Sequence, residues 1–150
     1  MAHSFRSHRF HLVWSTKNRQ PWITRDVQTR LYEVIGGIVR NNKGILLEAG
    51  GMPDHIHLLL ELGVLDKFTY LIRDMKAYSS GWVHKTFNHL AAFAWQEGYG
   101  SFSVSHSVTP KVGAYIQNQE QHHKNRTFEE EYIKLLQVHD VPYNPKYVFD

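Results

Sequence analysis

Two kinds of apolar pattern alternate along this chain, and their order constrains the fold more than any other feature. Short segments rich in β-branched and aromatic residues indicate strands, and longer segments with apolar residues every three or four positions indicate helices. Gly44 is placed to end the first helix, and Pro110 is placed to open the third. In chain order, the predicted elements are a strand at 9–15, a helix at 26–42, a strand at 45–49, a turn at 50–54, a strand at 55–62, a helix at 66–89, a strand at 99–105 and a helix at 110–123. A last helix follows, which Thr127 can cap, and Glu129 and Glu130 are favourable in its first turn.

This order is the split β-α-β arrangement of ferredoxin-like folds. We therefore expect an α+β fold, ferredoxin-like or RRM-like, with a four-stranded antiparallel sheet. Two helices would cover one face of the sheet and leave the other for function, followed by C-terminal helices. No linker, repeat or low-complexity tract divides the 150 residues, so we expect a single domain over residues 1–150. Such a fold leaves function open, because RNA-binding modules share it.

Composition excludes several classes of function. The chain has no cysteine, which rules out disulfides, thiolate zinc sites and cysteine nucleophiles. Its formal charge of +3 is compatible with a nucleic-acid partner but does not establish one. We find no secretory signal at the N-terminus and no run close to the roughly 20 apolar residues that cross a bilayer. We therefore expect a cytoplasmic protein without a membrane partner.

Two histidines in the third predicted strand are candidates for metal ligands. His55 and His57 are two residues apart, so the alternation of a strand sends both to one face, while Ile56, Leu58 and Leu60 point to the other. Two imidazoles that project together can share a divalent ion. The alternative is a hydrogen-bonded histidine pair with no ion, since buried imidazoles need polar partners in any case.

A tyrosine and a glutamine in the third predicted helix form the second candidate group. Tyr115 and Gln119 are four residues apart and share one side of a helix. A tyrosine hydroxyl can act as a nucleophile, although its unperturbed pKa of about 10 calls for a nearby cation or base. Gln119 can offer its carbonyl oxygen to a hard ion, and His122 and His123 are competing ligands or bases. The alternative is that Tyr115 simply packs and Gln119 is solvated.

Taken together, the two groups resemble the HUH single-tyrosine transposases of bacterial insertion sequences, the IS200-like transposase family. They also look like the transposase-like proteins of repetitive extragenic palindromes. The resemblance covers nearly the whole chain. The segments that carry it are the first strand with residues 16–19, Gly51-Met52-Pro53-Asp54-His55-Ile56-His57, residues 95–100, and residues 115–123.

The resemblance implies a DNA transposase in which His55, His57 and Gln119 bind Mg²⁺ or Mn²⁺ and Tyr115 is the catalytic nucleophile. Cleavage would leave a 5′-phosphotyrosine and a free 3′-hydroxyl, and the covalent bond would allow strands to be rejoined without ATP. The implied partner is single-stranded DNA with hairpin ends, and the protein would be nucleoid-associated when bound to it. The family also implies a homodimer in which the tyrosine helix acts in cis or in trans, with residues 105–109 as a movable connection.

Basic and aromatic residues are compatible with such a substrate. Lysines and arginines can contact phosphates, and exposed aromatic rings can stack on bases, worth about 1–3 kcal/mol per base. The alternative is that most of these charges are simply solvated and that Trp82 belongs to the core. The candidates are Arg6, Arg9, Lys17, Arg19, Lys76, Lys85, Lys124 and Arg126 for phosphates, and Trp22, Tyr78 and Trp82 for stacking.

Three other functions compete with this interpretation. A histidine-triad phosphoester or nucleotide hydrolase would need a third histidine at position 59, where the chain has Leu59. A non-catalytic or domesticated single-stranded nucleic-acid-binding protein on the same fold would tolerate loss of Tyr115. A ferredoxin-like protein with a purely structural histidine pair would bind neither Mg²⁺ nor Mn²⁺ at these residues.

Overall fold

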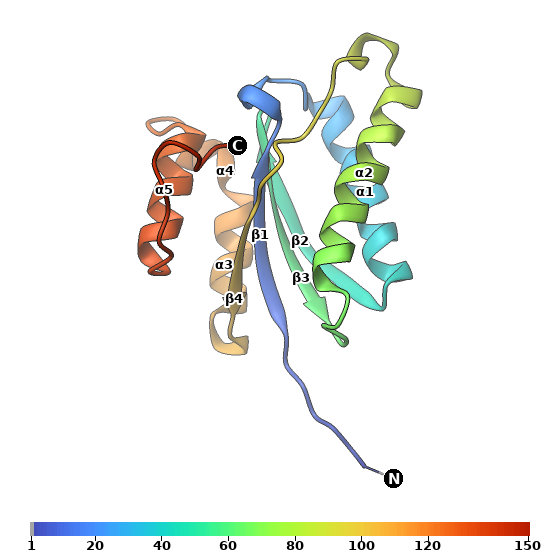
Figure 1. Ribbon diagram of the computed structural model, residues 1–150, viewed down its shortest axis with the longest axis vertical. Coiled ribbons are helices and arrows are strands. Elements are labelled where there is room, and N and C mark those ends of the chain that lie inside the picture. Colours follow the sequence, from blue (N-terminus) through green and yellow to red (C-terminus); the bar gives the residue numbers. More distant parts are fainter. Residues whose placement is uncertain (1) are drawn as a thin grey trace.

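The computed structural model describes residues 2–150 and contains the predicted strands and long helices (Figure 1). Three short 3-10 helices, at Lys17–Arg19, Asn88–Leu90 and His106–Val108, lie between the main elements. The main elements are β1 (Arg9–Ser15), α1 (Arg25–Asn41), β2 (Gly44–Met52), β3 (His55–Leu62), α2 (Phe68–Thr86), β4 (Gly100–Val104), α3 (Thr109–Gln117), α4 (Gln119–His122) and α5 (Phe128–Val138).

The four strands form one antiparallel sheet in the order β2-β3-β1-β4, which confirms the expected α+β architecture. β1 and β3 are the inner strands, and their register pairs Val13 with His57 and Ser15 with His55. Residues His55 to His57 are therefore paired with a neighbouring strand on both sides, β1 on one and β2 on the other. A central strand of this kind gives its side chains a fixed position.

One face of the sheet packs against α1 and α2 and contains the larger part of the core (Figure 1). Leu12 and Trp14 of β1 and Ile56, Leu58 and Leu60 of β3 are completely buried there. Each such side chain stabilises the fold by about 1.5–3 kcal/mol through the apolar surface it removes from water. The strand alternation predicted for β3 is thus confirmed, with Ile56, Leu58 and Leu60 on the face that α1 and α2 cover.

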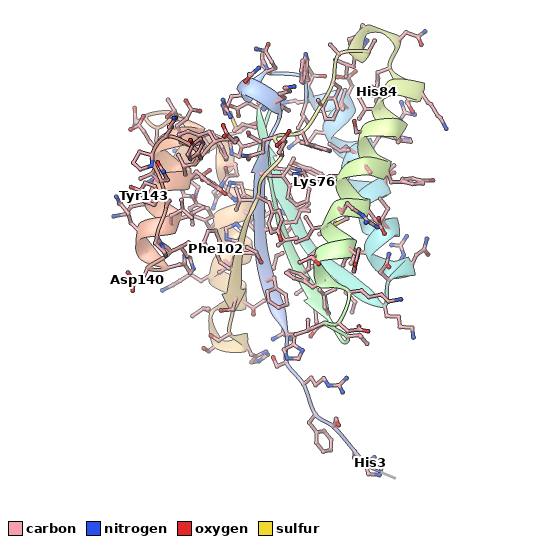
Figure 2. All side chains as sticks on the ribbon, viewed as in Figure 1. His3, Lys76, His84, Phe102, Asp140 and Tyr143 are labelled. Carbon is pink, nitrogen blue, oxygen red and sulfur yellow. The ribbon has the colours of Figure 1, made fainter. Side chains whose placement is uncertain are left out.

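The opposite face, which we expected to be left for function, is covered by α3, α4 and α5 (Figure 1). Phe102 of β4 packs with Phe128, Tyr132 and Leu136 of α5, and side chains fill the space on both sides of the sheet (Figure 2). Ile116 of α3 lies in a second apolar cluster on this face. The residues expected to carry the chemistry are consequently enclosed between the sheet and the C-terminal helices.

Two segments differ from the sequence prediction. β2 continues to Met52, so Gly50 and Gly51 belong to a strand rather than to a turn. These glycines allow close approach, because a Cβ added at Gly50 would lie 2.2 Å from the carbonyl oxygen of Ile116. The helix predicted at 110–123 is interrupted at Asn118, whose φ and ψ of −99° and 29° end α3 before α4 begins.

The helices within residues 2–150 are all too short or too polar to cross a lipid bilayer.

Candidate metal and nucleophile site

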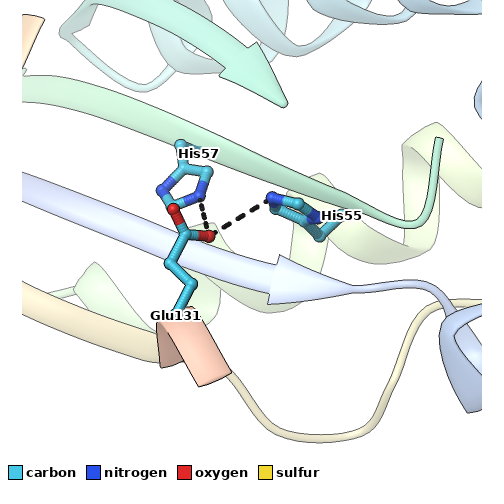
Figure 3. Close-up of side chains that lie close together, drawn as sticks. All are labelled: His55, His57 and Glu131. Atoms are coloured by element: carbon cyan, nitrogen blue, oxygen red, sulfur yellow. Dashed lines mark hydrogen bonds and ion pairs between the residues drawn. The ribbon is translucent and has the colours of Figure 1, made fainter. Parts of the chain in front are cut away.

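His55 and His57 project from β3 toward Glu131 of α5 (Figure 3), and both side chains are fully buried. Their ring centroids are 5.1 Å apart. Gln119 and Glu131, also buried, come from the helices that cover this face. The donor atoms of His55, His57 and Glu131 all lie within 4.8 Å of one another. The structure therefore brings the predicted histidine pair and Gln119 together and adds Glu131.

The two ring nitrogens of His55 have different partners. Nδ1 lies 2.7 Å from Asp54 Oδ1, and Nε2 lies 2.9 Å from the side-chain oxygen of Gln119. Burial by itself lowers the pKa of His55, but hydrogen bonds with Asp54 and Glu131 outweigh it and raise the pKa to about 9. Because a carboxylate only accepts hydrogen bonds, Nδ1 carries a proton, and Nε2 is the nitrogen that faces Gln119 and Glu131.

His57 is held between a second histidine and Glu131. Its Nδ1 lies 2.8 Å from Nε2 of His11 on β1, and its Nε2 lies 2.9 Å from Glu131 Oε1. Burial of the His57 ring lowers the pKa of His57. The pKa of His11 is lowered to about 3 by the burial of its own ring and by the positive charge of a protonated His57. His11 is therefore neutral and serves to orient the His57 ring, as outer partners of metal-binding histidines commonly do.

Glu131 is the functional candidate that the sequence prediction missed. It lies in the first turn of α5 with an exposed fraction of 1%, facing the histidines rather than solvent. Burial raises the pKa of its carboxyl, but hydrogen bonds with His123, His55 and His57 hold it well below the usual value. The available signal was a charged residue on the apolar side of a helix, since Phe128 and Tyr132 on that side are buried.

Tyr115 lies at the edge of the cluster, on α3. Its hydroxyl donates a hydrogen bond to Glu131 Oε2, and its ring lies edge-on to His57 with centroids 5.8 Å apart. Burial and the negative charge of Glu131 raise the pKa of Tyr115, so the hydroxyl rests protonated. The break at Asn118 turns Gln119 inward from α4, and its amide nitrogen donates to Glu131 Oε2 at 3.1 Å.

His122 and His123, which compete as ligands in the sequence analysis, have different positions. His123 Nδ1 donates to the carbonyl oxygen of Arg126 at 2.7 Å, and its Nε2 lies 3.1 Å from both Gln119 Oε1 and Glu131 Oε1. His122 instead stacks on the Tyr115 ring with centroids 4.3 Å apart. Only His123 thus joins the buried cluster, while His122 supports the tyrosine.

The arrangement of ring nitrogens and oxygens in this cluster fits a bound cation as well as it fits protonated imidazoles. His55 and His123 each use Nδ1–H to donate to an oxygen, so a neutral ring of either residue presents a lone pair at Nε2. Both lone pairs face oxygens of Gln119 and Glu131, which are acceptors in that direction. Lone pairs that face each other at such distances need a positive charge between them, either protons or a cation. The oxygen donors of Gln119 and Glu131 suit Mg²⁺ or Mn²⁺, and the imidazoles add nitrogen donors of the kind that bind first-row transition metals.

An open pocket of about 810 Å³ borders the cluster, and three cations and His123 form part of its lining. Arg19, Lys124 and Arg126 supply the cations, at positions that the sequence analysis proposes for phosphates. The lining also includes three carboxylates, those of Asp54, Glu129 and Glu130, so both signs of charge meet beside the cluster.

The remaining candidates for DNA contacts do not line this pocket, and several of them pack against the core or bind the backbone instead. Two aromatic candidates pack against the core, Trp22 beside Phe93 and Trp82 beside Phe87, whereas Tyr78 is exposed. The amine of Lys76 donates to backbone carbonyls.

A family model described as "Transposase IS200 like" matches residues 4–119 of this chain. The ISDra2 transposase TnpA of Deinococcus radiodurans is 24% identical, over 73% of this chain and 82% of that protein. A solved structure assigned as a transposase of D. radiodurans is 25% identical, with a TM-score of 0.65 over 79% of this chain and 95% of that one. A REP-associated tyrosine transposase bound to a REP hairpin shares the fold, with a TM-score of 0.60, 19% identity, and coverage of 83% of this chain and 75% of that one.

Proposed function

This chain belongs to the IS200-like transposase family, and we propose that it cleaves and rejoins single-stranded DNA through a covalent 5′-phosphotyrosine at Tyr115. One observation carries the proposal. The Tyr115 hydroxyl of α3 and the buried pair His55 and His57 of β3 converge on a single carboxylate, that of Glu131 in α5. A nucleophile next to a cluster of metal-ligating groups is the arrangement that metal-assisted phosphoryl transfer requires.

His55, His57 and Gln119 are the proposed ligands of Mg²⁺ or Mn²⁺, consistent with the fit of their donor atoms to a cation. When bound, the ion would supply positive charge to a phosphoryl oxygen of the scissile phosphate. Asp54 and His11 orient the two imidazoles through their Nδ1 atoms. Side chains of β1 and of the turn before β3 therefore hold the two imidazoles in place before DNA binds.

Tyr115 performs the transfer itself. Its O–H bond is directed at Glu131, so the lone pairs of the phenolic oxygen are free to attack phosphorus. As the new oxygen–phosphorus bond forms, the bond to the 3′ oxygen breaks, and that oxygen takes up a proton to become a 3′-hydroxyl. The proton that the tyrosine gives up balances the one that the 3′ oxygen takes up. Attack by another 3′-hydroxyl on the phosphotyrosine reverses these steps and rejoins strands.

Single-stranded DNA with hairpin ends is the proposed substrate. The pocket beside His123 supports this substrate, since its lining includes Arg19, Lys124 and Arg126, three cations that can contact phosphates next to the cluster. The hairpin in the structurally similar REP-associated transposase supports the choice of hairpin ends. We also propose a homodimer, which light scattering of the purified protein would test. One chain already brings its own Tyr115 to its own histidines, so completing the cluster does not require a partner.

The test uses purified protein, Mg²⁺ or Mn²⁺, and hairpin-bearing single-stranded DNA from the flanks of its own gene. A 5′-phosphotyrosine keeps the 3′ part of the DNA on the protein, so a 3′-terminal label should migrate with the protein on denaturing gels. A 5′-terminal label should appear in a shortened free strand. Both products should require the metal.

Tyr115→Phe removes one hydroxyl and should abolish the adduct while DNA binding persists. Tyr70→Phe is the matched control, because Tyr70 is 55% exposed on α2, and it should form the adduct at the rate of the unmodified protein. An adduct formed by the Tyr115→Phe protein would refute the assignment. Intact DNA binding by the unmodified protein without any adduct would instead favour a non-catalytic binding protein.

A further inference from the structure

α5 lies outside the part of the chain that the family model matches, yet it contributes to the proposed metal site. The match ends at Gln119, and α5 begins at Phe128. Glu131 nevertheless occupies the centre of the histidine cluster, separated from His57 by 74 positions in the sequence. The contribution of this helix is therefore not accounted for by the family match and calls for its own explanation.

Burying a carboxylate is unfavourable unless strong partners compensate for its lost hydration. Glu131 has an exposed fraction of 1%, and the groups around its Oε1 are three imidazole nitrogens. The Nε2 atoms of His57, His123 and His55 lie 2.9, 3.1 and 3.4 Å from this oxygen. Three ring nitrogens, two from β3 and one from the segment after α4, therefore converge on a single oxygen atom.

These spacings are those of neighbouring ligands around one ion. Ligands about 2.1 Å from an octahedral ion and at right angles to each other lie about 3 Å apart. The oxygen of Gln119 has the same relation to two of the histidines, at 2.9 Å from His55 and 3.1 Å from His123. Glu131 Oε1 thus lies at ligand-to-ligand distance from the histidines and is directed at the same point.

The second oxygen of Glu131 faces away from the histidines. Oε2 accepts hydrogen bonds from the Tyr115 hydroxyl and from the Gln119 amide nitrogen. Because the amide nitrogen of Gln119 donates to Oε2, the side-chain oxygen of Gln119 is the atom that faces His55. One carboxylate therefore links the nucleophile to the set of metal-ligating groups.

From this geometry we infer that Glu131 is a ligand of the divalent cation, supplied by α5, and that it positions Tyr115 through its second oxygen. The inference rests on the proposed metal-dependent function and adds a negatively charged ligand to His55, His57 and Gln119. The negative charge strengthens binding of a divalent ion, and the link through Oε2 places the phenolic oxygen next to that ion.

The test measures Mn²⁺ binding directly, without DNA. Free Mn²⁺ gives a six-line electron paramagnetic resonance signal that decreases on binding, so titration of the protein yields an affinity. Glu131→Gln should bind Mn²⁺ at least tenfold more weakly than the unmodified protein. Glu129→Gln is the matched control, since it removes the same charge from the same helical turn, and its affinity should change less than twofold. Equal Mn²⁺ affinity for Glu131→Gln and the unmodified protein would overturn the inference.

A crystal structure of the unmodified protein with Mn²⁺ tests the same point if Glu131→Gln fails to fold. The anomalous signal of Mn²⁺ should place the ion in direct contact with a Glu131 oxygen, and an ion held by the histidines without Glu131 would refute the inference. The proposed function fails separately. If the unmodified protein binds no Mn²⁺ and still forms the DNA adduct with chelator present, the proposed metal dependence of the reaction is refuted.

Discussion

The contact between Gly50 and α3 provides a sensitive test of how the tyrosine is positioned. A Cβ at Gly50 would lie 2.2 Å from the carbonyl oxygen of Ile116, whereas ordinary contacts of this kind are 3.4–4 Å. Gly50→Ala therefore forces α3 to retreat from β2 by roughly 1 Å, or forces the strand to bend by as much. Tyr115 precedes Ile116 in the sequence and must move with it.

The magnitude follows from two effects of this displacement. Overpacking of this kind lowers the free energy of unfolding by about 1–3 kcal/mol. Displacing a reacting group by about 1 Å reduces a reaction rate by about 100-fold. We expect Gly50→Ala to remain folded and to form the covalent DNA adduct about 100-fold more slowly than the unmodified protein.

Single-turnover adduct formation on the 3′-labelled strand and urea unfolding measure these two quantities. Gly113→Ala is the control on the same helix, because its Cβ would make an ordinary contact 3.8 Å from the Glu48 carboxylate. That variant should gain about 0.5–1 kcal/mol, the usual gain of alanine over glycine inside a helix, and keep its rate. An unchanged adduct rate in Gly50→Ala would refute the reasoning, since it would mean that the position of α3 does not limit the reaction.

Three further predictions concern the supports of the site. Thr127→Ala removes the capping box of α5, formed with Glu130, and should lower the free energy of unfolding in urea by about 1 kcal/mol; no change would mean that α5 does not need this cap. His11→Leu removes the partner that fixes the His57 ring and should weaken Mn²⁺ binding about 10–100-fold in the same titration, whereas unaltered affinity would exclude an orienting role. His57→Ala should abolish metal-dependent adduct formation, and undiminished cleavage with Mg²⁺ would remove His57 from the ligand set.

Local patterns in the sequence determined the elements and their faces. The alternation in β3 sends His55 and His57 to one side because a strand has a period of two, and this needs no tertiary information. The cap at Thr127 is equally local, since the chemistry of the cap involves only residues within the first helical turn. The order of strands and helices then leaves few topologies, of which the split β-α-β arrangement is the one observed.

Tertiary structure decided which groups meet those histidines. Glu131 looks like one more acidic residue at a helix N-terminus, where a negative charge is favourable in any fold. Its role arises only because α5 packs across β1 and β4 and directs it to residues far away in the sequence. Likewise, Gly50 reads locally as part of a turn and is a contact point for α3 only in the folded protein. Periodicity specifies which face of its own strand or helix a side chain occupies. Which residue that side chain then contacts depends on how distant elements pack together.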